Sequence, residues 1–455
     1  MAGSKSSDGG ARRRRTRREF LARSGAAALG AASATMVVPH VHAAGDETIR
    51  IALVGCGNRG TGAASQALST EGPVVLWAMA DLFQERIDGC LASLGRAAEG
   101  SYDRAARESL ARRVDVPRER QFVGFDAFRH AIESGVDVVL LTTFPHFRPE
   151  QFEYAARQGK HVFMEKPVAV DVPGIRRVLA ADQVARQKNL KVVVGLQRHH
   201  DVIYRETVQR LHDGAVGRLV LLRCYWNCAM DRKLDERPEG MGEMEFQMRN
   251  RYFFTWLCGD HNVEQHVHNI DVCNWIMNAH PVEANGMGGR QYRNGREHGE
   301  IFDHHFVEYT YADGTKMFSQ CRQIPGCWNT VSEHVHGTEG VAELSPARGR
   351  IAARGDDWSM RRAKANPYQV EHDVLFDRVR NDKRHNEAEY AAHSTMTAIL
   401  GRMATYSGKV VTWDEAMRSE RALVPDRYAW DGTPPVVPDE NGEYPCAMPG
   451  ATEPV

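Results

Sequence analysis

Residues 49–60 of the chain read Ile-Arg-Ile-Ala-Leu-Val-Gly-Cys-Gly-Asn-Arg-Gly. The first six residues are mostly apolar, as in a buried strand, and a glycine-rich turn follows at once. Residues 61–68 then have the pattern of a helix. A strand, a G-x-G-x-x-G turn and a helix in this order are typical of a dinucleotide-binding unit, in which the pyrophosphate lies at the helix N-terminus.

Each residue of this turn has an expected role. Gly55 allows the tight turn, Gly57 lets backbone N–H groups approach the pyrophosphate, and Gly60 lets the helix pack on the strand. Asn58 and Arg59 lie between these glycines, so we expect them to bind the cofactor too. The motif alone is weak evidence, because glycine turns are common.

An acidic residue strengthens the prediction. A second apolar run, residues 74–80, ends in Asp81, 21 residues after Gly60. A carboxylate here accepts hydrogen bonds from the ribose 2′-OH and repels a 2′-phosphate, so NAD is favoured over NADP. Leu82 beside it brings no positive charge. The plainer alternatives are a common turn for the glycines and a helix cap for Asp81.

Further strand and helix patterns follow at residues 136–142, 149–158 and 161–164. This alternation predicts an α/β Rossmann domain with a parallel, doubly wound sheet. Ligands bind at the carboxyl ends of such strands. We therefore expect Thr143, in the segment 142–146, and Glu165 and Lys166, in the segment 165–167, to line the nicotinamide site.

The chain of 455 residues is longer than the roughly 250–300 residues of a single core, so two domains are expected. Residues 1–43 are predicted to be a targeting segment. Within it, residues 16–21 read Thr-Arg-Arg-Glu-Phe-Leu, the pattern of a twin-arginine signal, and an Ala-rich stretch follows. We therefore expect recognition by the twin-arginine export machinery, cleavage near Ala43 and a periplasmic or otherwise extracytoplasmic location. A basic disordered tail is the alternative.

Charge and cysteine usage exclude several classes of protein. The leader holds eight Lys/Arg and two Asp/Glu, so the remaining chain carries 50 basic and 57 acidic residues, a net charge of −7. An acidic chain without a basic cluster is a poor partner for nucleic acid. No apolar run beyond the leader is long enough for a membrane span, so no membrane association is expected after cleavage. The nine cysteines show no C-x-x-C spacing, and the fold should not depend on disulfides.

From about residue 49 to residue 407 the chain resembles the glucose–fructose oxidoreductase / inositol dehydrogenase (Gfo/Idh/MocA) family. Residues 165–167 match the Glu-Lys-Pro signature of that family, and residues 195–198 (Gly-Leu-Gln-Arg) and 214–218 (Gly-Ala-Val-Gly-Arg) also look like it. The resemblance implies a second, α+β domain with an open, mainly antiparallel sheet that covers the nicotinamide. Strand patterns at residues 219–225, 306–311, 316–321 and 331–337 agree.

The expected domains are therefore a leader (residues 1–43), an NAD-binding Rossmann domain (46–197), a substrate-binding α+β domain (198–407) and a C-terminal extension (408–455). Gln197, at the end of the last Rossmann strand, is expected to bind the cofactor.

The resemblance also implies which residues are catalytic. In the family, the lysine of the Glu-Lys-Pro signature and a histidine from a D-x-x-x-H helix flank the reacting carbon. Here Lys166 and His268 match, and Glu264 replaces the usual aspartate. We expect one helix to carry residues 261, 264, 268, 271 and 275 on a single face. His268 and Lys166 are candidates for acid–base chemistry, and Glu264 could orient His268 or hydrogen-bond the substrate.

Other features differ from the family or have plainer interpretations. The family often has a histidine where Arg148 stands, so contacts to the nicotinamide ribose are expected to differ. His261, Glu264, His266 and His268 could be read as a metal site, but no H-E-x-x-H motif is present and none is predicted. The remaining aromatic and amide residues are more typical of sheet core than of a sugar platform: Tyr225, Trp226, Asn227 and Trp256.

The predicted function is NAD-dependent hydride transfer on a carbinol carbon of a sugar, cyclitol or glycoside. One alternative is a redox-neutral NAD-dependent glycosidase resembling α-N-acetylgalactosaminidase, or a lyase or epimerase, that acts through a keto-sugar. A non-catalytic sensor is another. Little free NAD is expected outside the cytoplasm, so we hypothesise that the enzyme retains and regenerates its NAD. The resemblance also implies a homo-oligomer.

Overall fold

The computed structural model describes residues 47–99, 112–361 and 365–454. The expected leader lies outside these residues. Among the described helices, none combines the length and the apolar character needed to cross a membrane. All nine cysteines are free thiols.

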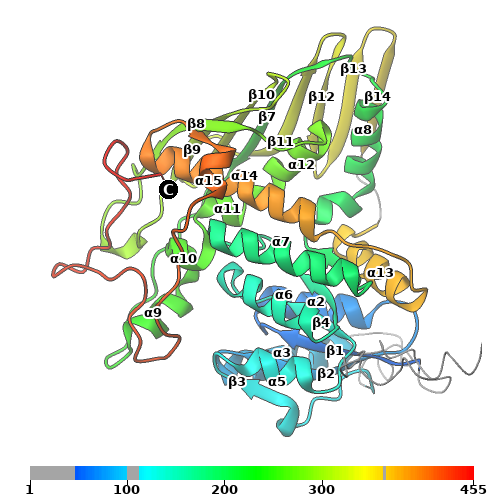
Figure 1. Cartoon of the computed structure of the whole chain (residues 1–455), viewed down its shortest axis with the longest axis vertical. Helices are drawn as coiled ribbons and strands as arrows, with labels where there is room; N and C mark the ends of the chain where they lie inside the picture. The colour runs from blue at the N-terminus through cyan, green and yellow to red at the C-terminus, as the bar shows by residue number, and fades with distance from the viewer. Residues whose placement is uncertain (1–46, 100–111, 362–364, 455) are drawn as a thin grey trace, which may run out of the picture. The chain divides into compact units, whose positions relative to one another are not determined.

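A six-stranded parallel sheet, sheet A, occupies the N-terminal part of the described chain (Figure 1). Its order is β3-β2-β1-β4-β5-β6, which is the doubly wound order with its switch point between β1 and β4. The predicted Rossmann sheet is thus confirmed. The strands are β1 (Ile49–Val54), β2 (Val74–Asp81), β3 (Gln121–Val123), β4 (Val138–Leu141), β5 (His161–Met164) and β6 (Val192–Val194).

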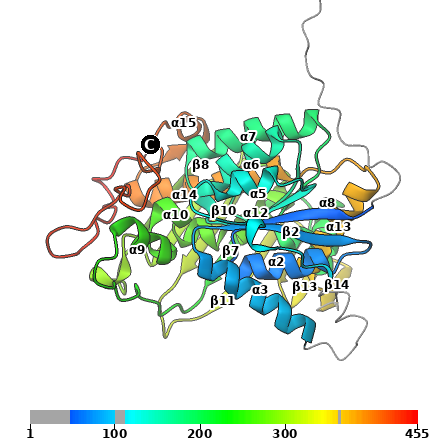
Figure 2. The ribbon, with the colours of Figure 1, turned by 90° about the horizontal axis from the view of Figure 1, so that it is seen from below.

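Helices cover both faces of sheet A because its strands are apolar on both sides, with all four residues of β4 buried. Figure 2 shows α2 and α3 on one face and α5, α6 and α7 on the other. Helix α13 packs on the same face of sheet A as α2 and α3, although it follows the second sheet in sequence. The bounds are α2 (Asn58–Leu68), α3 (Gln84–Glu99), α5 (Ala127–Glu133), α6 (Arg148–Arg157), α7 (Val172–Gln187) and α13 (Pro367–Arg380).

A nine-stranded sheet, sheet B, follows in the order β14-β13-β12-β11-β7-β10-β9-β8-β15. Its neighbours pair antiparallel except β7 and β10, which are parallel. The expected open, mainly antiparallel sheet is thus confirmed. The strands are β7 (Leu219–Asn227), β8 (Glu283–Gly289), β9 (His304–Thr310), β10 (Lys316–Arg322), β11 (Thr330–Gly337), β12 (Gly340–Ser345), β13 (Arg348–Ala353), β14 (Asp356–Arg361) and β15 (Val411–Thr412).

The long helix α14 (Ala388–Ser407) connects the two sheets, because it packs on α7 of the Rossmann domain as well as on α12 (Val267–Met277) and β8. The hydroxyl of Ser394 donates to Asp271 of α12 at 2.8 Å. The other helices are α8 (Val202–His212), α9 (Glu243–Arg249), α10 (Thr255–Cys258), α11 (His261–Glu264) and α15 (Trp413–Met417), with 3-10 turns η1 (Arg118–Arg120), η2 (Pro145–Phe147), η3 (Gln197–His200), η4 (Arg251–Phe253) and η5 (Arg296–His298).

The first part of the expected C-terminal extension, residues 408–455, belongs to sheet B. Strand β15 lies within these residues and pairs with β8. Beyond α15 the chain runs without regular structure along the Rossmann domain, where the backbone N–H of Leu423 donates to Asp171 at 2.7 Å. The Trp430 ring lies 4.8 Å from the ring of Phe125.

Candidate active site

A cavity of about 490 Å³ lies at the carboxyl ends of the sheet A strands, where ligands of doubly wound folds bind. One part of its wall is the glycine turn, and another part comes from residues that precede or begin α12. It contains nine of the residues expected in the site: Gly55, Gly57, Asn58, Arg59, Gly60, Asp81, Thr143, Glu165 and Lys166, together with Glu264 and His268 from the second half of the chain.

The glycine turn fits a dinucleotide pyrophosphate. Gly55 has φ +98°, and a Cβ there would lie 2.5 Å from the Thr143 nitrogen. A Cβ on Gly60 would lie 1.9 Å from the Gly55 oxygen. A Cβ on Gly57 would meet nothing within 4 Å, so this residue faces open space. No side chain caps the N-terminus of α2, which leaves its backbone N–H groups for an anion.

Asp81 both holds this turn and lines the cavity. Its carboxylate accepts from the Cys56 N–H at 2.6 Å and from the Phe83 N–H at 3.1 Å. Burial raises the pKa of Asp81, and these hydrogen bonds oppose that shift. Arg86 also lines the cavity. The sequence analysis did not identify it, because it lies on α3 and not directly beside Asp81.

Arg59 and Glu165 bind each other. The Arg59 guanidinium forms an ion pair with Glu165 and another, at 3.1 Å, with Glu371 of α13. Gly195 makes room for this arrangement, since a Cβ there would lie 2.7 Å from Glu165 Oε2. Arg59 also lies over the Tyr368 ring, 5.2 Å from its centroid. Both predicted residues reach the cavity wall, but their charges are mutually compensated.

Arg148 joins two of the loops that line the cavity. Its guanidinium donates to the carbonyl oxygens of Thr143 and Pro167, at 2.5 Å each. The Thr143 hydroxyl donates to Gln151 at 2.6 Å. Arg148 therefore holds the loops after β4 and β5 together, at the position where the family often has a histidine.

Gln197 is not on the cavity wall. Its side-chain amide donates to the Tyr368 hydroxyl at 3.2 Å, and Tyr368 is the residue that lines the cavity. Gln197 therefore contacts a residue of the cavity wall and does not line the cavity itself. Tyr368 comes from α13, about 170 residues later, and no sequence motif marks it.

Lys166 and His268 face the same cavity. The Lys166 ammonium donates to the backbone oxygen of Glu264 at 2.5 Å. Burial lowers the pKa of Lys166 and, together with the Lys166 charge, holds the pKa of His268 well below its usual value. His268 Nδ1 is buried without a hydrogen-bond partner, and the Trp226 ring stacks on the imidazole at 6.0 Å.

Glu264 pairs with an arginine rather than with His268. Its Oε1 accepts from Arg251 at 3.1 Å, and its Oε2 is buried without a partner. Burial works against ionisation, but Arg251 and Lys166 outweigh it and lower the pKa of Glu264. Of the two expected roles, orientation of His268 is not what the structure shows, whereas a free oxygen for a ligand is present.

The helix that carries these residues is not continuous, which corrects the sequence prediction of one face. Helix α11 ends at Glu264 and α12 begins at Val267. The break is explained by His266, whose imidazole bonds to Ser319 of β10 at 2.8 Å and lies 3.7 Å from the Cys224 sulfur of β7. These contacts anchor the chain to sheet B.

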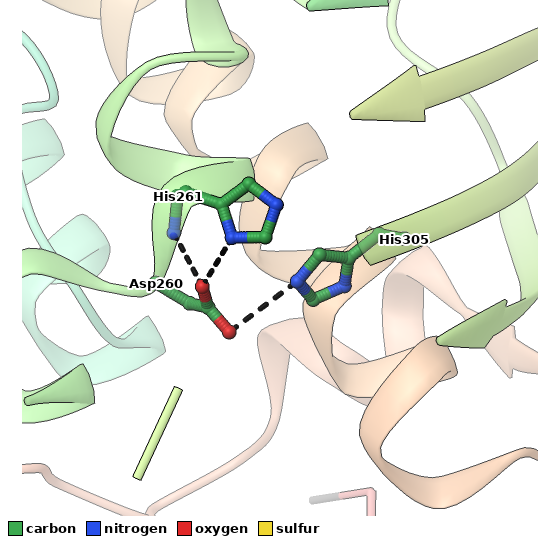
Figure 3. Close-up of side chains that lie close together, drawn as sticks. All are labelled: Asp260, His261 and His305. Atoms are coloured by element: carbon green, nitrogen blue, oxygen red, sulfur yellow. Dashed lines mark hydrogen bonds and ion pairs between the residues drawn. The ribbon is translucent and has the colours of Figure 1, made fainter. Parts of the chain in front are cut away.

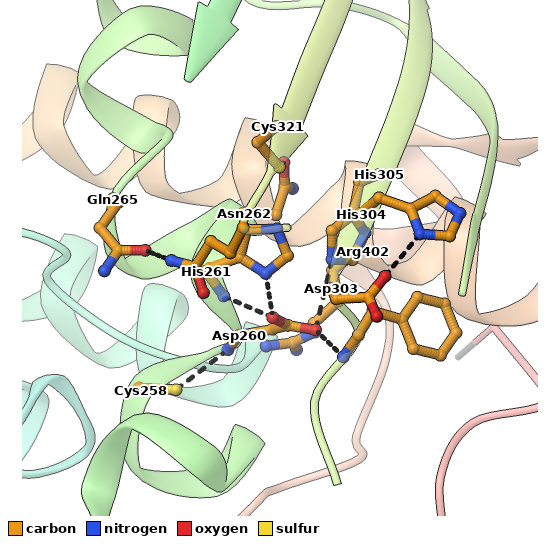
Figure 4. Close-up of polar contacts among 12 residues, drawn as sticks. Cys258, Asp260, His261, Asn262, Gln265, Asp303, His304, His305, Cys321 and Arg402 are labelled. Atoms are coloured by element: carbon orange, nitrogen blue, oxygen red, sulfur yellow. Dashed lines mark hydrogen bonds and ion pairs between the residues drawn. The ribbon is translucent and has the colours of Figure 1, made fainter. Parts of the chain in front are cut away.

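Below α11, Asp260 is the centre of a buried polar cluster (Figure 3). Its Oδ1 accepts from the N–H and the Nδ1 of His261, the latter at 2.7 Å. Its Oδ2 accepts from Tyr406 at 2.6 Å and from the Phe302 N–H at 3.0 Å, and lies 3.3 Å from His305 Nε2. Figure 4 shows His261, His305 and Arg402 around the Asp260 carboxylate.

Asp260, His261 and His305 form the one group of metal-type ligands detected among the described residues, with atoms within 4.8 Å of one another. Both carboxylate oxygens are already used by protein donors, and the positive charges of Arg293 and Arg402 lie nearby. These features suit a buried anion that ties β9 and α14 to α11 better than a cation site. Of the four residues considered from sequence, His261, Glu264 and His266 bind different partners, His268 contacts the Trp226 ring, and the four do not converge.

Of the aromatic and amide residues expected in the sheet core, all but Trp226 are buried. Tyr225 is buried, and Trp256 is buried with its indole N–H donating to Gln247 at 2.7 Å. Asn227 is also buried. Trp226 alone lies beside a catalytic candidate, His268.

Comparison with known proteins supports the assignment of the cavity to an NAD-binding oxidoreductase. Residues 49–196 match the family model GFO_IDH_MocA, described as an oxidoreductase family with an NAD-binding Rossmann fold. The inositol 2-dehydrogenase of Klebsiella pneumoniae is 25% identical over 298 residues, which are 62% of this chain and 79% of that protein.

Two solved structures show the same fold. Scyllo-inositol dehydrogenase from Lactobacillus casei with bound NAD(H) and scyllo-inositol superposes with a TM-score of 0.59 at 19% identity, covering 81% of this chain and 100% of that one. Aldose–aldose oxidoreductase from Caulobacter crescentus superposes with a TM-score of 0.61 at 17% identity, covering 80% and 99%. The expectation of an NAD-binding oxidoreductase is confirmed.

Proposed function

We propose that this chain, an NAD-dependent oxidoreductase whose Rossmann domain belongs to the Gfo/Idh/MocA family, transfers a hydride from a CH–OH carbon of a sugar, cyclitol or glycoside. One observation carries the proposal. A single cavity joins the glycine turn, which fits a dinucleotide, to Lys166 and His268, which suit proton transfer. The relatives named above are dehydrogenases of inositols and an oxidoreductase of aldoses, which supports a carbohydrate substrate.

The oxidation requires removal of two electrons and two hydrogens from the carbinol. NAD, when bound, supplies the acceptor for the hydride. The O–H proton goes to a base of the protein, and the product is a ketone or lactone. His268 is suited to accept this proton, because its imidazole lines the cavity and its Nδ1 has no hydrogen-bond partner in the protein. Lys166, while protonated, donates a hydrogen bond to the same oxygen and stabilises its developing negative charge.

Glu264 has a positioning role in this scheme. Its backbone carbonyl holds the Lys166 ammonium, and its carboxylate is held by Arg251. The unpartnered Oε2 is available for a substrate hydroxyl. Glu264, where the family has an aspartate, thus contacts Arg251 through its carboxylate and Lys166 through its backbone oxygen.

A panel of sugars, cyclitols and glycosides, incubated with purified protein and NAD, tests the proposal. We expect some compounds of the panel to reduce NAD. This reduction should not occur when Lys166 and His268 are both replaced by alanine. Equal rates in wild type and double variant would remove the proposal. Keto-sugar formation or glycoside cleavage without net NAD reduction would instead favour the redox-neutral alternative, to which the dehydrogenase relatives lend no support.

We also propose that the protein is exported by the twin-arginine route with its NAD bound and that it forms a homo-oligomer. The supporting pattern for export is Thr-Arg-Arg-Glu-Phe-Leu at residues 16–21. The change of Arg17 and Arg18 to lysine should leave the protein in the cytoplasm, as shown by cell fractionation, and light scattering would measure the oligomer. A periplasmic wild type that emerges without nicotinamide would contradict cofactor retention.

A further inference from the structure

The two ends of the cavity differ in their charge balance. At the glycine turn, Arg59 is paired with Glu165, and Asp81 lies near Arg86. A second carboxylate, that of Glu371, also pairs with Arg59, at 3.1 Å, and is fully buried. At this end of the cavity both Arg59 and Arg86 therefore have carboxylates beside them.

At the catalytic end, cations outnumber anions. Four cationic side chains line it, Arg148, Lys166, Arg232 and Arg251, and Glu264 is the one carboxylate there that pairs with any of them in the described chain. That carboxylate is taken by Arg251 at 3.1 Å. Even if Lys166 is deprotonated, two positive charges remain uncompensated. The excess runs against the net charge of −7 that follows from the sequence beyond the leader.

Among the described residues, no carboxylate forms an ion pair with Arg148 or Lys166, although the charges of Glu165 and Glu264 act on both from a greater distance. Arg148 is 4% exposed and is held by two carbonyl oxygens, with its Nε buried and unpartnered. Lys166 is held by the backbone oxygen of Glu264. A buried charge without a counter-ion is costly, and an anionic ligand would offset that cost.

Arg232 and Arg251 are placed to contact such a ligand. Both lie on the ring of Tyr252, with guanidinium carbons 5.3 Å and 4.0 Å from its centroid. Tyr252 itself lines the cavity. A guanidinium stacked on an aromatic ring keeps its edge N–H donors free for a planar or tetrahedral anion.

We propose that the substrate of the oxidoreductase is anionic: a sugar or cyclitol derivative whose carboxylate, phosphate or sulfate group meets Arg232 and Arg251 while its carbinol lies between Lys166 and His268. This inference rests on the proposed function and names its substrate class. A neutral polyol leaves the positive charge of this end uncompensated, whereas an acidic one compensates it and is steered into the cavity.

Matched pairs of compounds test the inference: glucose with glucuronate, galactose with galacturonate, and glucose with its 6-phosphate and 6-sulfate. Binding to the protein saturated with NAD is measured by calorimetry, and kcat/KM by reduced nicotinamide. We expect the acidic member to exceed its neutral partner at least ten-fold in one pair, with the advantage falling as salt rises. Comparison among the three acids identifies the anionic group.

Arg232→Gln provides the residue-level test, because Arg232 lies at the exposed rim and its loss should not unfold the protein. The acidic substrate should lose about three- to ten-fold in kcat/KM, through KM, while the neutral partner is unchanged. Lys233→Gln is the matched control: it removes a charge from the next residue, which pairs with Glu297 at 3.7 Å and does not line the cavity.

Three outcomes would overturn the inference. Neutral sugars that are bound and oxidised as well as their acids would leave the proposed function standing and remove the anionic substrate. If none of the acidic compounds binds, the anionic substrate class is also removed, and the proposed function still stands. If Arg232→Gln weakens NAD binding and leaves the ratio of acid to neutral unchanged, these arginines serve the cofactor pyrophosphate instead.

Discussion

The glycine-turn end and the catalytic end of one cavity are built in opposite ways. At the turn, the charged side chains bind groups of the protein: Asp81 binds two backbone N–H groups, and Arg59 binds Glu165, while the uncapped N–H groups of α2 remain for a ligand. At the catalytic end, Glu264 Oε2 and His268 Nδ1 are buried without partners. Buried polar groups are normally hydrogen-bonded, and both atoms belong to residues that line the cavity, so a bound substrate would be placed to supply the missing hydrogen bonds.

The largest expected effects on turnover come from substitutions at the catalytic end of the cavity. Lys166→Ala and His268→Ala should each reduce turnover by about 10²–10⁴-fold while NAD affinity stays within about two-fold. Steady-state kinetics and calorimetric titration with NAD measure the two quantities. A loss of NAD binding that parallels the loss of turnover would mean that the two ends are not independent.

A matched pair of glycine variants sharpens the same comparison at the cofactor end. Gly57→Ala adds a methyl group into open cavity, so the melting temperature should be preserved while NAD affinity falls by about ten-fold or more. Gly60→Ala places its methyl group 1.9 Å from the Gly55 oxygen, so this variant should lose stability as well. Equal melting temperatures for the two variants would show that the turn relaxes easily.

A smaller effect is expected at Asp81. Asp81→Ser should weaken NAD binding and improve NADP binding, because the carboxylate that repels the 2′-phosphate is removed. The ratio of NAD affinity to NADP affinity should fall by about ten-fold. Arg86 then remains as a cation on the cavity wall. The double change Asp81→Ser with Arg86→Gln should abolish the gain for NADP. Unchanged affinities for both cofactors in the single variant would leave Asp81 as a support for the turn alone.

The smallest effect concerns pH. Burial lowers the pKa of Lys166, so its proton is lost at a lower pH than that of an exposed lysine. If the protonated form assists the reaction, kcat should fall about ten-fold per pH unit above that lowered pKa. Lys166→Arg should retain some activity and move the alkaline fall upward by at least one unit, because arginine keeps its proton. A wild-type profile that is flat to pH 10 would exclude this role for Lys166.

The residues expected to bind the cofactor could be grouped from the sequence because they are close in the chain, and they do line one cavity. Gly55, Gly57, Gly60 and Asp81 lie within 27 positions, and local strand, turn and helix patterns place them. The parallel character of sheet A and the mainly antiparallel character of sheet B also followed from pattern and family resemblance.

The catalytic end was predicted only in part. Lys166, Glu264 and His268 were identified through motifs, but the break between α11 and α12 depends on contacts of His266 with two strands that lie distant in sequence. Tyr368 reaches the cavity from a helix that follows sheet B. Periodicity along one segment cannot report such tertiary contacts.

Transfer of an isotopic label tests the account most directly. A substrate from the panel that carries deuterium on the carbinol carbon is turned over by wild-type protein, and the nicotinamide is examined by mass spectrometry. The account predicts one deuterium on the nicotinamide ring for each carbinol oxidised, and none with the Lys166→Ala, His268→Ala double variant. Deuterium released to water, with an unlabelled nicotinamide, would contradict hydride transfer in this cavity.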